Sequence, residues 1–116
     1  HQTVLVCDDV SLPKDHSTGR RGVAGTLIIE KIVGAAAEAG ASLAECKALG
    51  DRVNNVTASM GVALTSCTVP ALGQPTFDIG DNEIEMGVGI HGERGREPMD
   101  LTSASNIVDH LANEID

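Results

Sequence analysis

The sequence EIEMGVGIHGERG, residues 83–95, is the stretch from which the fold of this chain is best worked out. Read with the two-residue period of a β-strand, residues 83–91 have two unequal faces. We therefore expect a strand over residues 83–91 that places its apolar face on a core and ends at a histidine. The apolar face would carry Ile84, Met86, Val88 and Ile90, and the other face Glu83, Glu85, Gly87, Gly89 and His91.

The two glycines beside His91 suggest that something comes close to the backbone there. Glycine is unfavourable inside a strand and supplies no side chain to pack, so Gly87 and Gly89 leave space next to the imidazole. A bound ligand would explain this pattern. A bulge, the passage of another chain segment or an ordinary strand-end histidine bonded to a carbonyl would explain it as well. The sharp turn predicted by Gly92 and Gly95 favours a ligand site without excluding the other interpretations.

Four stretches of the chain together resemble the substrate-binding subunit, or domain, of dihydroxyacetone (glycerone) kinases. They are GRRGVAGT (19–26), KIVGAAAE (31–38), SMGVALTSCTVP (59–70) and, above all, GVGIHGE (87–93). The resemblance covers essentially the whole chain in the right order. It implies that His91 adds to the carbonyl of dihydroxyacetone and holds it as a covalent hemiaminal. The acid and base of that family, an aspartate and a second histidine, belong to an N-terminal segment that this chain does not contain, so no other catalytic position carries over.

The resemblance also implies the architecture and the partners. We expect an α/β fold, with a mixed β-sheet and helices packed on it, and residues 1–116 would be a fragment, roughly a third, of a larger two-domain kinase subunit. The chain itself would hold no cofactor. The phosphoryl donor would be MgATP or a nucleotide-loaded partner subunit, and the complete protein would form a homo-oligomer, a homodimer by resemblance. A non-catalytic ketose sensor that regulates transcription through a partner is the alternative.

Composition narrows the function classes. The chain has 8 basic and 17 acidic residues and a net charge of −9, which argues against binding to nucleic acid or to an anionic membrane. The residues Cys7, Cys46 and Cys67 have no zinc-site spacing and are odd in number, so we expect buried, reduced thiols in a cytoplasmic protein. With one Phe and no Trp or Tyr, the core must be built from aliphatic side chains.

The spacing of apolar residues, together with glycines and helix-capping residues, predicts the other elements. We expect a buried strand at residues 4–6, a loop at 11–22, and a largely buried helix at 22–39 that Gly40 ends. Ser42 and Glu45 form a capping-box pattern at the start of a second helix. A strand at 60–64, a loop at 70–82 with a short strand at 76–79, and a helix capped by Thr102 or Ser103 complete the prediction.

Three further patterns call for an interpretation. Asp8 and Asp9 follow the first predicted strand, and we expect them to cap and solvate its exit, although they could serve a site. Glycines at every third position, Gly19, Gly22 and Gly25, open a helix, but the G-K-[ST] of a P-loop is missing, so we expect helix packing and turn geometry. The histidines at 16, 91 and 110 lack the spacing of a metal site.

Overall fold

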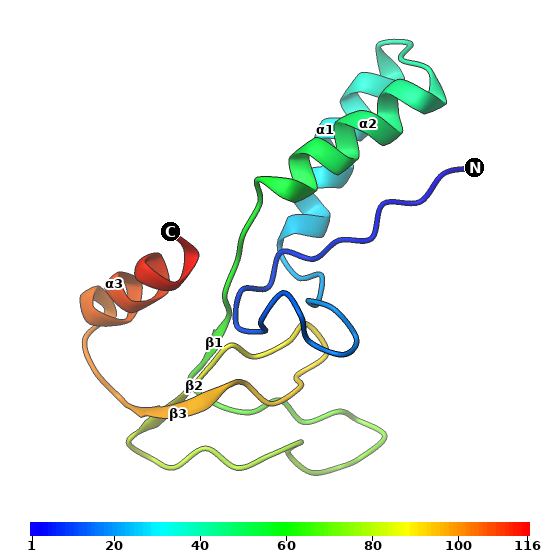
Figure 1. The fold of residues 1–116 in the computed structure, drawn as a ribbon. Coiled ribbons are helices and arrows are strands. Elements are labelled where there is room, and N and C mark those ends of the chain that lie inside the picture. The colour runs from blue at the N-terminus through cyan, green and yellow to red at the C-terminus, as the bar shows by residue number, and fades with distance from the viewer.

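A computed structural model describes residues 1–116, and it contains three helices and a three-stranded antiparallel sheet of order β1-β2-β3. The elements are α1 (Gly25–Glu38), α2 (Leu43–Asn55), β1 (Val62–Ala63), β2 (Glu83–Met86), β3 (Glu97–Asp100) and α3 (Ala104–Ile115). Figure 1 shows that α1 and α2 form a hairpin extending from one end of the sheet, with α3 on the other side. The α/β class is confirmed, although the helices do not cover the sheet and the parallel pairing is limited to an isolated bridge between Asp9 and Ser59.

The helical hairpin follows its local sequence signals closely. The Ser42 side chain accepts from the Glu45 N–H, and the Glu45 carboxylate accepts from the Ser42 N–H, so the predicted capping box at the start of α2 is confirmed. Gly40 has φ +93° and follows α1, as predicted for a residue that ends a helix. The first helix begins at Gly25 and not at residue 22, and the Asp8 carboxylate caps this start by accepting from the N–H groups of Val23 and Gly25.

The prediction that α1 is largely buried is wrong for this chain. Ile29 is its one buried apolar side chain, whereas Leu27, Ile28 and Ile32 are 61%, 44% and 41% exposed. The physical reason is that α2 is the one helix or strand that packs against α1, and one such neighbour can cover only one face of a helix that is apolar on most of its surface. The hairpin therefore presents an uncovered aliphatic face.

The centre of the core lies on β2. Ile84 and Met86 are completely buried, as predicted, and Glu85 between them is also buried, in register with Ala63 of β1 and Pro98 of β3. The strand stops at Met86 and does not continue to His91, which corrects the predicted strand over residues 83–91. Gly87 has φ +78°, so the chain leaves the sheet there, and Ile90 is exposed and not in the core.

Three predicted strands are shortened or missing. The strand at 60–64 is reduced to β1, and residues 76–79 form no strand; the neighbouring Pro75 makes an isolated bridge with Thr68. The predicted buried strand at residues 4–6 is wrong, since these residues form no strand and Leu5 is 83% exposed; the Asn54 side chain of α2 binds the Leu5 carbonyl (2.8 Å) and the Cys7 N–H (3.1 Å). An amide side chain can satisfy backbone groups as a neighbouring strand would.

One strand was not predicted from the sequence. The strand β3 is short, charged at both ends and contains Pro98, which weakens the strand signal and is typical of a sheet edge, where β3 lies. The C-terminal helix α3 begins after Ser103, whose side chain accepts from the Asn106 N–H, so the predicted cap is confirmed. An ion pair between Arg96 and Glu114 (2.9 Å) ties α3 to the chain near the sheet.

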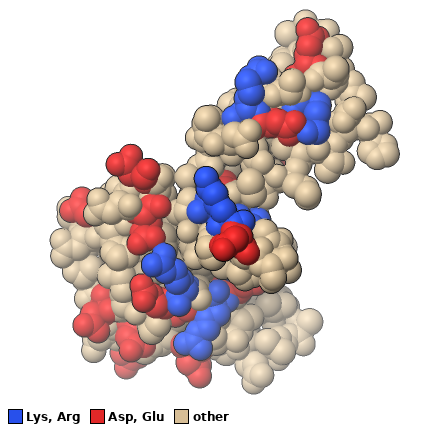
Figure 2. Space-filling view, in the orientation of Figure 1, with Lys and Arg blue, Asp and Glu red and all other residues tan.

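The surface agrees with the acidic composition. Figure 2 shows acidic side chains spread over the part that contains the sheet, and basic side chains with acidic ones beside them. The three cysteines are free, but Cys7 and Cys67 are exposed, so the expectation of buried thiols is wrong for these two. No helix combines the length and the apolar character that crossing a bilayer requires.

Candidate functional site

The candidate site is the loop of residues 87–95, which begins where β2 ends. The loop is closed by hydrogen bonds from the Gly89 N–H to the Glu93 carbonyl and from the Gly92 N–H to the Gly89 carbonyl, both 3.1 Å. At Gly95, an added Cβ would lie 1.9 Å from the Met86 carbonyl oxygen, so no larger residue fits without moving the backbone. The glycines thus fold the loop tightly against the end of the strand.

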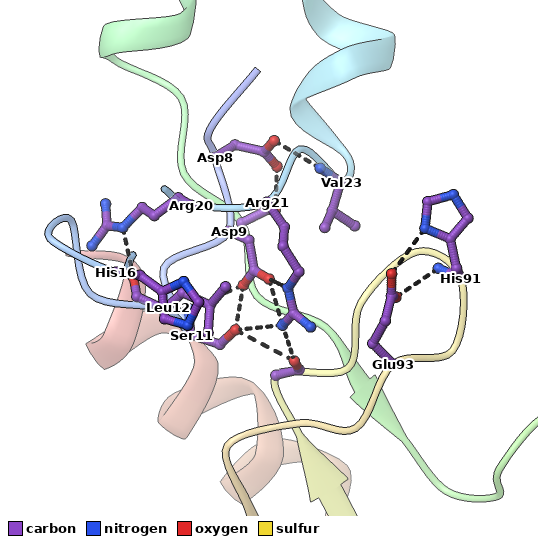
Figure 3. Close-up of polar contacts among 12 residues, drawn as sticks. Asp8, Asp9, Ser11, Leu12, His16, Arg20, Arg21, Val23, His91 and Glu93 are labelled. Atoms are coloured by element: carbon purple, nitrogen blue, oxygen red, sulfur yellow. Dashed lines mark hydrogen bonds and ion pairs between the residues drawn. The ribbon is translucent and has the colours of Figure 1, made fainter. Parts of the chain in front are cut away.

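His91 lies at the outer turn of this loop. Its side chain is 82% exposed, and its Nδ1 is 2.9 Å from Oε1 of Glu93. The other carboxylate oxygen of Glu93 accepts from the backbone N–H of His91, also at 2.9 Å (Figure 3). A single carboxylate therefore holds both the backbone and the ring of His91 and limits rotation of the imidazole. The sequence reasoning missed Glu93, although its position two residues after His91 was a readable signal.

The charge of Glu93 determines which ring nitrogen is free. The hydrogen bond from its own backbone N–H is the largest contribution that stabilises the Glu93 carboxylate. Desolvation opposes it, and the side chain and backbone of His91 add further stabilisation. Together these contacts hold the pKa of Glu93 below its usual range. Near neutral pH the carboxylate is ionised and can only accept hydrogen bonds. In a neutral His91 the proton must then be on Nδ1, which leaves a lone pair on Nε2.

A cleft beside the loop gives His91 a neighbouring space of ≈ 370 Å³. Its wall includes Ala63, Cys67, Phe77, Val88 and His91. The size is in the range of small-molecule sites. A larger cleft of ≈ 730 Å³ lies between the loop that contains Lys14, the end of α2 and the end of α3, but it does not include His91.

The glycines beside His91 are explained by close approach of protein side chains. A Cβ at Gly89 would lie 2.3 Å from Oε2 of Glu93 and 2.8 Å from Nη1 of Arg21. At Gly87, which has a positive φ, a Cβ would lie 2.5 Å from the Cβ of Ser11. Of the alternatives left open by the sequence, another part of the chain therefore fills the space at both positions, and Val88, expected in the core, is half-buried and lines the cleft.

Arg21 and Asp9 form a second polar cluster beside the start of the loop (Figure 3). Asp9 is 1% exposed and accepts from Arg21 Nε at 2.7 Å and from the Ser11 hydroxyl at 2.6 Å. Arg21 Nη2 donates to the Gly87 carbonyl at 2.6 Å. Asp9 is thus buried and paired, and not solvated as expected. No local pattern could predict the contact between Arg21 and Gly87, because the two residues are 66 positions apart.

Asp8 has a structural role. Its carboxylate accepts from the N–H groups of Val23 and Gly25, both at 2.9 Å, and from the hydroxyl of Ser59. Burial would raise the pKa of Asp8, but these donated hydrogen bonds outweigh it and hold the pKa below its ordinary value of 3.8. The expectation that Asp8 caps and solvates the exit of a first strand is therefore wrong: the side chain is buried, and it caps the start of α1.

The glycine repeat at the start of α1 serves packing and turn geometry. A Cβ at Gly22 would lie 3.0 Å from Val6, and one at Gly25 would lie 2.6 Å from the Asp8 carboxylate carbon. This confirms packing for Gly22 and Gly25, whereas Gly19, which has φ +76° and nothing within 4 Å of an added Cβ, serves turn geometry. His16 bonds to Thr18 in the preceding loop, and the structure does not bring it to His91.

Comparison with known proteins shows which family the chain belongs to. A family model described as "Dak1 domain" matches residues 1–116. The dihydroxyacetone-binding subunit DhaK of the PEP-dependent dihydroxyacetone kinase of Escherichia coli is 51% identical over 110 residues, which are 94% of this chain and 31% of that subunit.

Solved structures agree. The dihydroxyacetone kinase operon co-activator Dha-DhaQ superposes with a TM-score of 0.87 at 30% identity, over 97% of this chain and 34% of that one. The dihydroxyacetone kinase from C. freundii in complex with AMP-PNP and Mg2+ gives 0.81 at 36% identity, over 95% of this chain and 20% of that one. The chain spans about a third, or less, of each of these relatives. By sequence and by fold, the chain belongs to the Dak1 domain family.

Proposed function

We propose that this chain is the substrate-binding part of a dihydroxyacetone kinase, in which His91 holds dihydroxyacetone as a covalent hemiaminal during phosphorylation of its terminal hydroxyl. The observation that carries the proposal is the exposed imidazole of His91, fixed through Nδ1 by Glu93 beside a small cleft. Membership of the Dak1 family and the names of the relatives support the substrate.

The chemistry follows from the free nitrogen of the ring. The Nε2 lone pair adds to the carbonyl carbon, a C–N bond forms, and the π electrons of the carbonyl move to oxygen, which takes up a proton and becomes a hydroxyl. The ring gains positive charge, which the Glu93 carboxylate at Nδ1 stabilises. Because a ketone has no leaving group, the addition is reversible. Glycerol has no carbonyl and is therefore rejected, although its hydroxyls resemble those of the ketose.

Phosphoryl transfer depends on positioning and on neutralisation of charge. The bond to His91 would fix the ketose so that its terminal hydroxyl meets a donor held elsewhere. We propose MgATP, or a nucleotide-loaded partner subunit, as that donor, giving dihydroxyacetone phosphate. The AMP-PNP and Mg2+ in the C. freundii kinase structure support a nucleotide donor. We assign no acid or base to this chain, and we propose that it acts in the cytoplasm within a homodimer.

A second candidate is a ketose sensor without catalysis. The co-activator structure that superposes with a TM-score of 0.87 favours it, because a binding histidine could serve sensing alone. The higher identity to the E. coli kinase subunit, 51% against 30% for the co-activator, favours the kinase.

The test uses the full-length protein with each donor in turn, MgATP or a purified nucleotide-loaded kinase subunit. We expect dihydroxyacetone phosphate from dihydroxyacetone, no phosphorylated product from glycerol, and loss of product in His91→Ala. Equal phosphorylation of glycerol, or undiminished activity of His91→Ala, contradicts the proposed role of His91. Ketose binding without product from either donor would instead identify the sensor.

A further inference from the structure

We infer that Arg21 is a positioning residue for His91, acting through the backbone of Gly87 and the space beside Gly89. The inference deepens the proposed function and depends on it for the effect on ketose binding. The effect of Arg21 on the orientation of the imidazole does not depend on the proposed function, because it follows from contacts within this chain.

The guanidinium of Arg21 joins the N-terminal segment to the His91 loop. Arg21 Nε donates to Asp9 at 2.7 Å, while Nη2 donates to Ser11 Oγ at 3.0 Å and to the Gly87 carbonyl at 2.6 Å. Gly87 is the first residue beyond β2, and the loop that carries His91 starts there. Arg21 therefore fixes the loop at its point of departure from the sheet.

The same guanidinium lies beside Gly89, next to which Glu93, the residue that holds His91, also lies; the ion pair of Arg21 is with Asp9, not with Glu93. Nη1 of Arg21 and Oε2 of Glu93 lie 2.8 Å and 2.3 Å from the position that a Cβ of Gly89 would occupy. The two side chains thus approach Gly89 together, and Glu93 in turn holds both the ring and the backbone of His91. A shift of the Gly87–Gly89 backbone would carry Glu93 and the imidazole with it, since the Gly89 N–H is bonded to the Glu93 carbonyl.

The shape of arginine matters here as well as its charge. Asp9 is buried, so a cation beside it is needed to avoid an unpaired buried carboxylate. A lysine could supply that charge from one point, but only the planar fork of arginine donates to Asp9 and to Gly87 in fixed directions at once. Arg21→Lys therefore separates stability of the cluster from positioning of the loop.

The experiment compares Arg21→Lys with Arg20→Lys in the full-length protein. Arg20 is the matched control because it is the neighbouring arginine and its one side-chain hydrogen bond goes to the Leu12 carbonyl, away from the His91 loop. The first readout is the pair of ring ¹⁵N shifts of His91, which report tautomer and hydrogen bonding without any ligand. The second is the equilibrium for adduct formation with [2-¹³C]dihydroxyacetone.

For Arg21→Lys we expect ring ¹⁵N shifts that move towards a mixture of the two tautomers, and adduct formation weakened by about 10- to 100-fold, the range expected for loss of a hydrogen bond to a charged group. Arg20→Lys should match the unmodified protein in both. If Arg21→Lys keeps both readouts unchanged, Arg21 does not position His91. A wild-type protein that forms no adduct defeats the proposed function, and the ring shifts still decide the role of Arg21.

A second variant covers the case in which Arg21→Lys fails to fold. Ser11→Ala removes one partner of Arg21 Nη2, together with the hydrogen bonds of the Ser11 hydroxyl to Asp9 and to the Gly87 carbonyl, and leaves the ion pair between Arg21 and Asp9 in place. We expect altered ring shifts of His91 and an adduct weakened several-fold. Unchanged ring shifts in a folded Ser11→Ala protein would overturn the inference.

Discussion

Replacing Gly89 with alanine should impair the site while sparing the fold. The new Cβ would lie 2.3 Å from Oε2 of Glu93, whereas ordinary contacts begin at 3.4 Å, so the carboxylate must retreat by about 1.1 Å, the difference between these two distances. Arg21 Nη1, at 2.8 Å, must also give way. Both groups are the ends of flexible side chains, so they can move without disturbing the backbone.

The expected magnitudes differ for stability and for function. Gly89 does not have a positive φ, so alanine introduces no backbone strain and gains about 0.4–1 kcal/mol through the unfolded chain. Loss of the exposed contact between Glu93 and His91 costs about 1 kcal/mol. The free energy of unfolding should therefore change by about 1 kcal/mol or less. Displacement of the group that orients His91 by about 1 Å should lower phosphorylation of dihydroxyacetone by up to about 100-fold.

The assay measures chemical denaturation and the rate of product formation for Gly89→Ala in the full-length protein. Gly34→Ala is the control, because Gly34 lies within α1 and a Cβ there meets nothing within 4 Å. The control should gain about 0.5–1 kcal/mol from helix propensity and keep its activity. Full activity of Gly89→Ala would refute the reasoning that links Glu93 to the reactivity of His91.

The lowered pKa of Asp8 predicts that the stability of the folded protein depends on pH. The stabilisation that the ionised Asp8 contributes is complete above about pH 5, and it is lost as the pH falls through the folded-state pKa, which is below 3.8. The free energy of unfolding of Asp8→Asn should therefore be lower than that of the unmodified protein by about 1–3 kcal/mol at pH 7, and this difference should shrink in acid. Denaturant titrations in which the difference stays constant from pH 7 to pH 3 would contradict the prediction. A protein made of residues 1–116 alone should self-associate through the apolar face of α1, where Leu27, Ile28 and Ile32 are exposed, and a monomer by sedimentation at roughly 50 μM would count against it. The same protein, mixed with either phosphoryl donor, should not phosphorylate dihydroxyacetone, and product above a blank without protein would show that this chain holds a complete active site.

The sequence correctly predicted the features that depend on residues close together in the chain. The capping box of Ser42 and Glu45 needs only residues three apart, and it appears as predicted. The alternation at Ile84 and Met86 correctly identified the core strand. The end of that strand was missed because a glycine such as Gly87 is compatible with a strand interior and with a left-handed turn, and the choice depends on what packs beside it.

The remaining features depend on contacts that the sequence pattern does not contain. The apolar surface of α1 predicted burial, but burial requires a neighbour to cover it, and α2 covers only one face. The site was only partly predictable for the same reason. His91 was found from its motif, whereas the approach of Arg21 to Gly87 joins segments far apart in the chain.

The covalent bond between His91 and the ketose can be observed by ¹³C NMR of [2-¹³C]dihydroxyacetone mixed with the full-length protein. We predict that the carbonyl carbon of the bound ketose becomes tetrahedral, with a signal in the sp³ range that is absent from His91→Ala. The His91→Ala protein should keep its fold, because the side chain is 82% exposed. A tetrahedral signal that persists in folded His91→Ala, or bound ketose whose C2 keeps its carbonyl shift in the unmodified protein, would contradict the assignment of His91 as the covalent anchor.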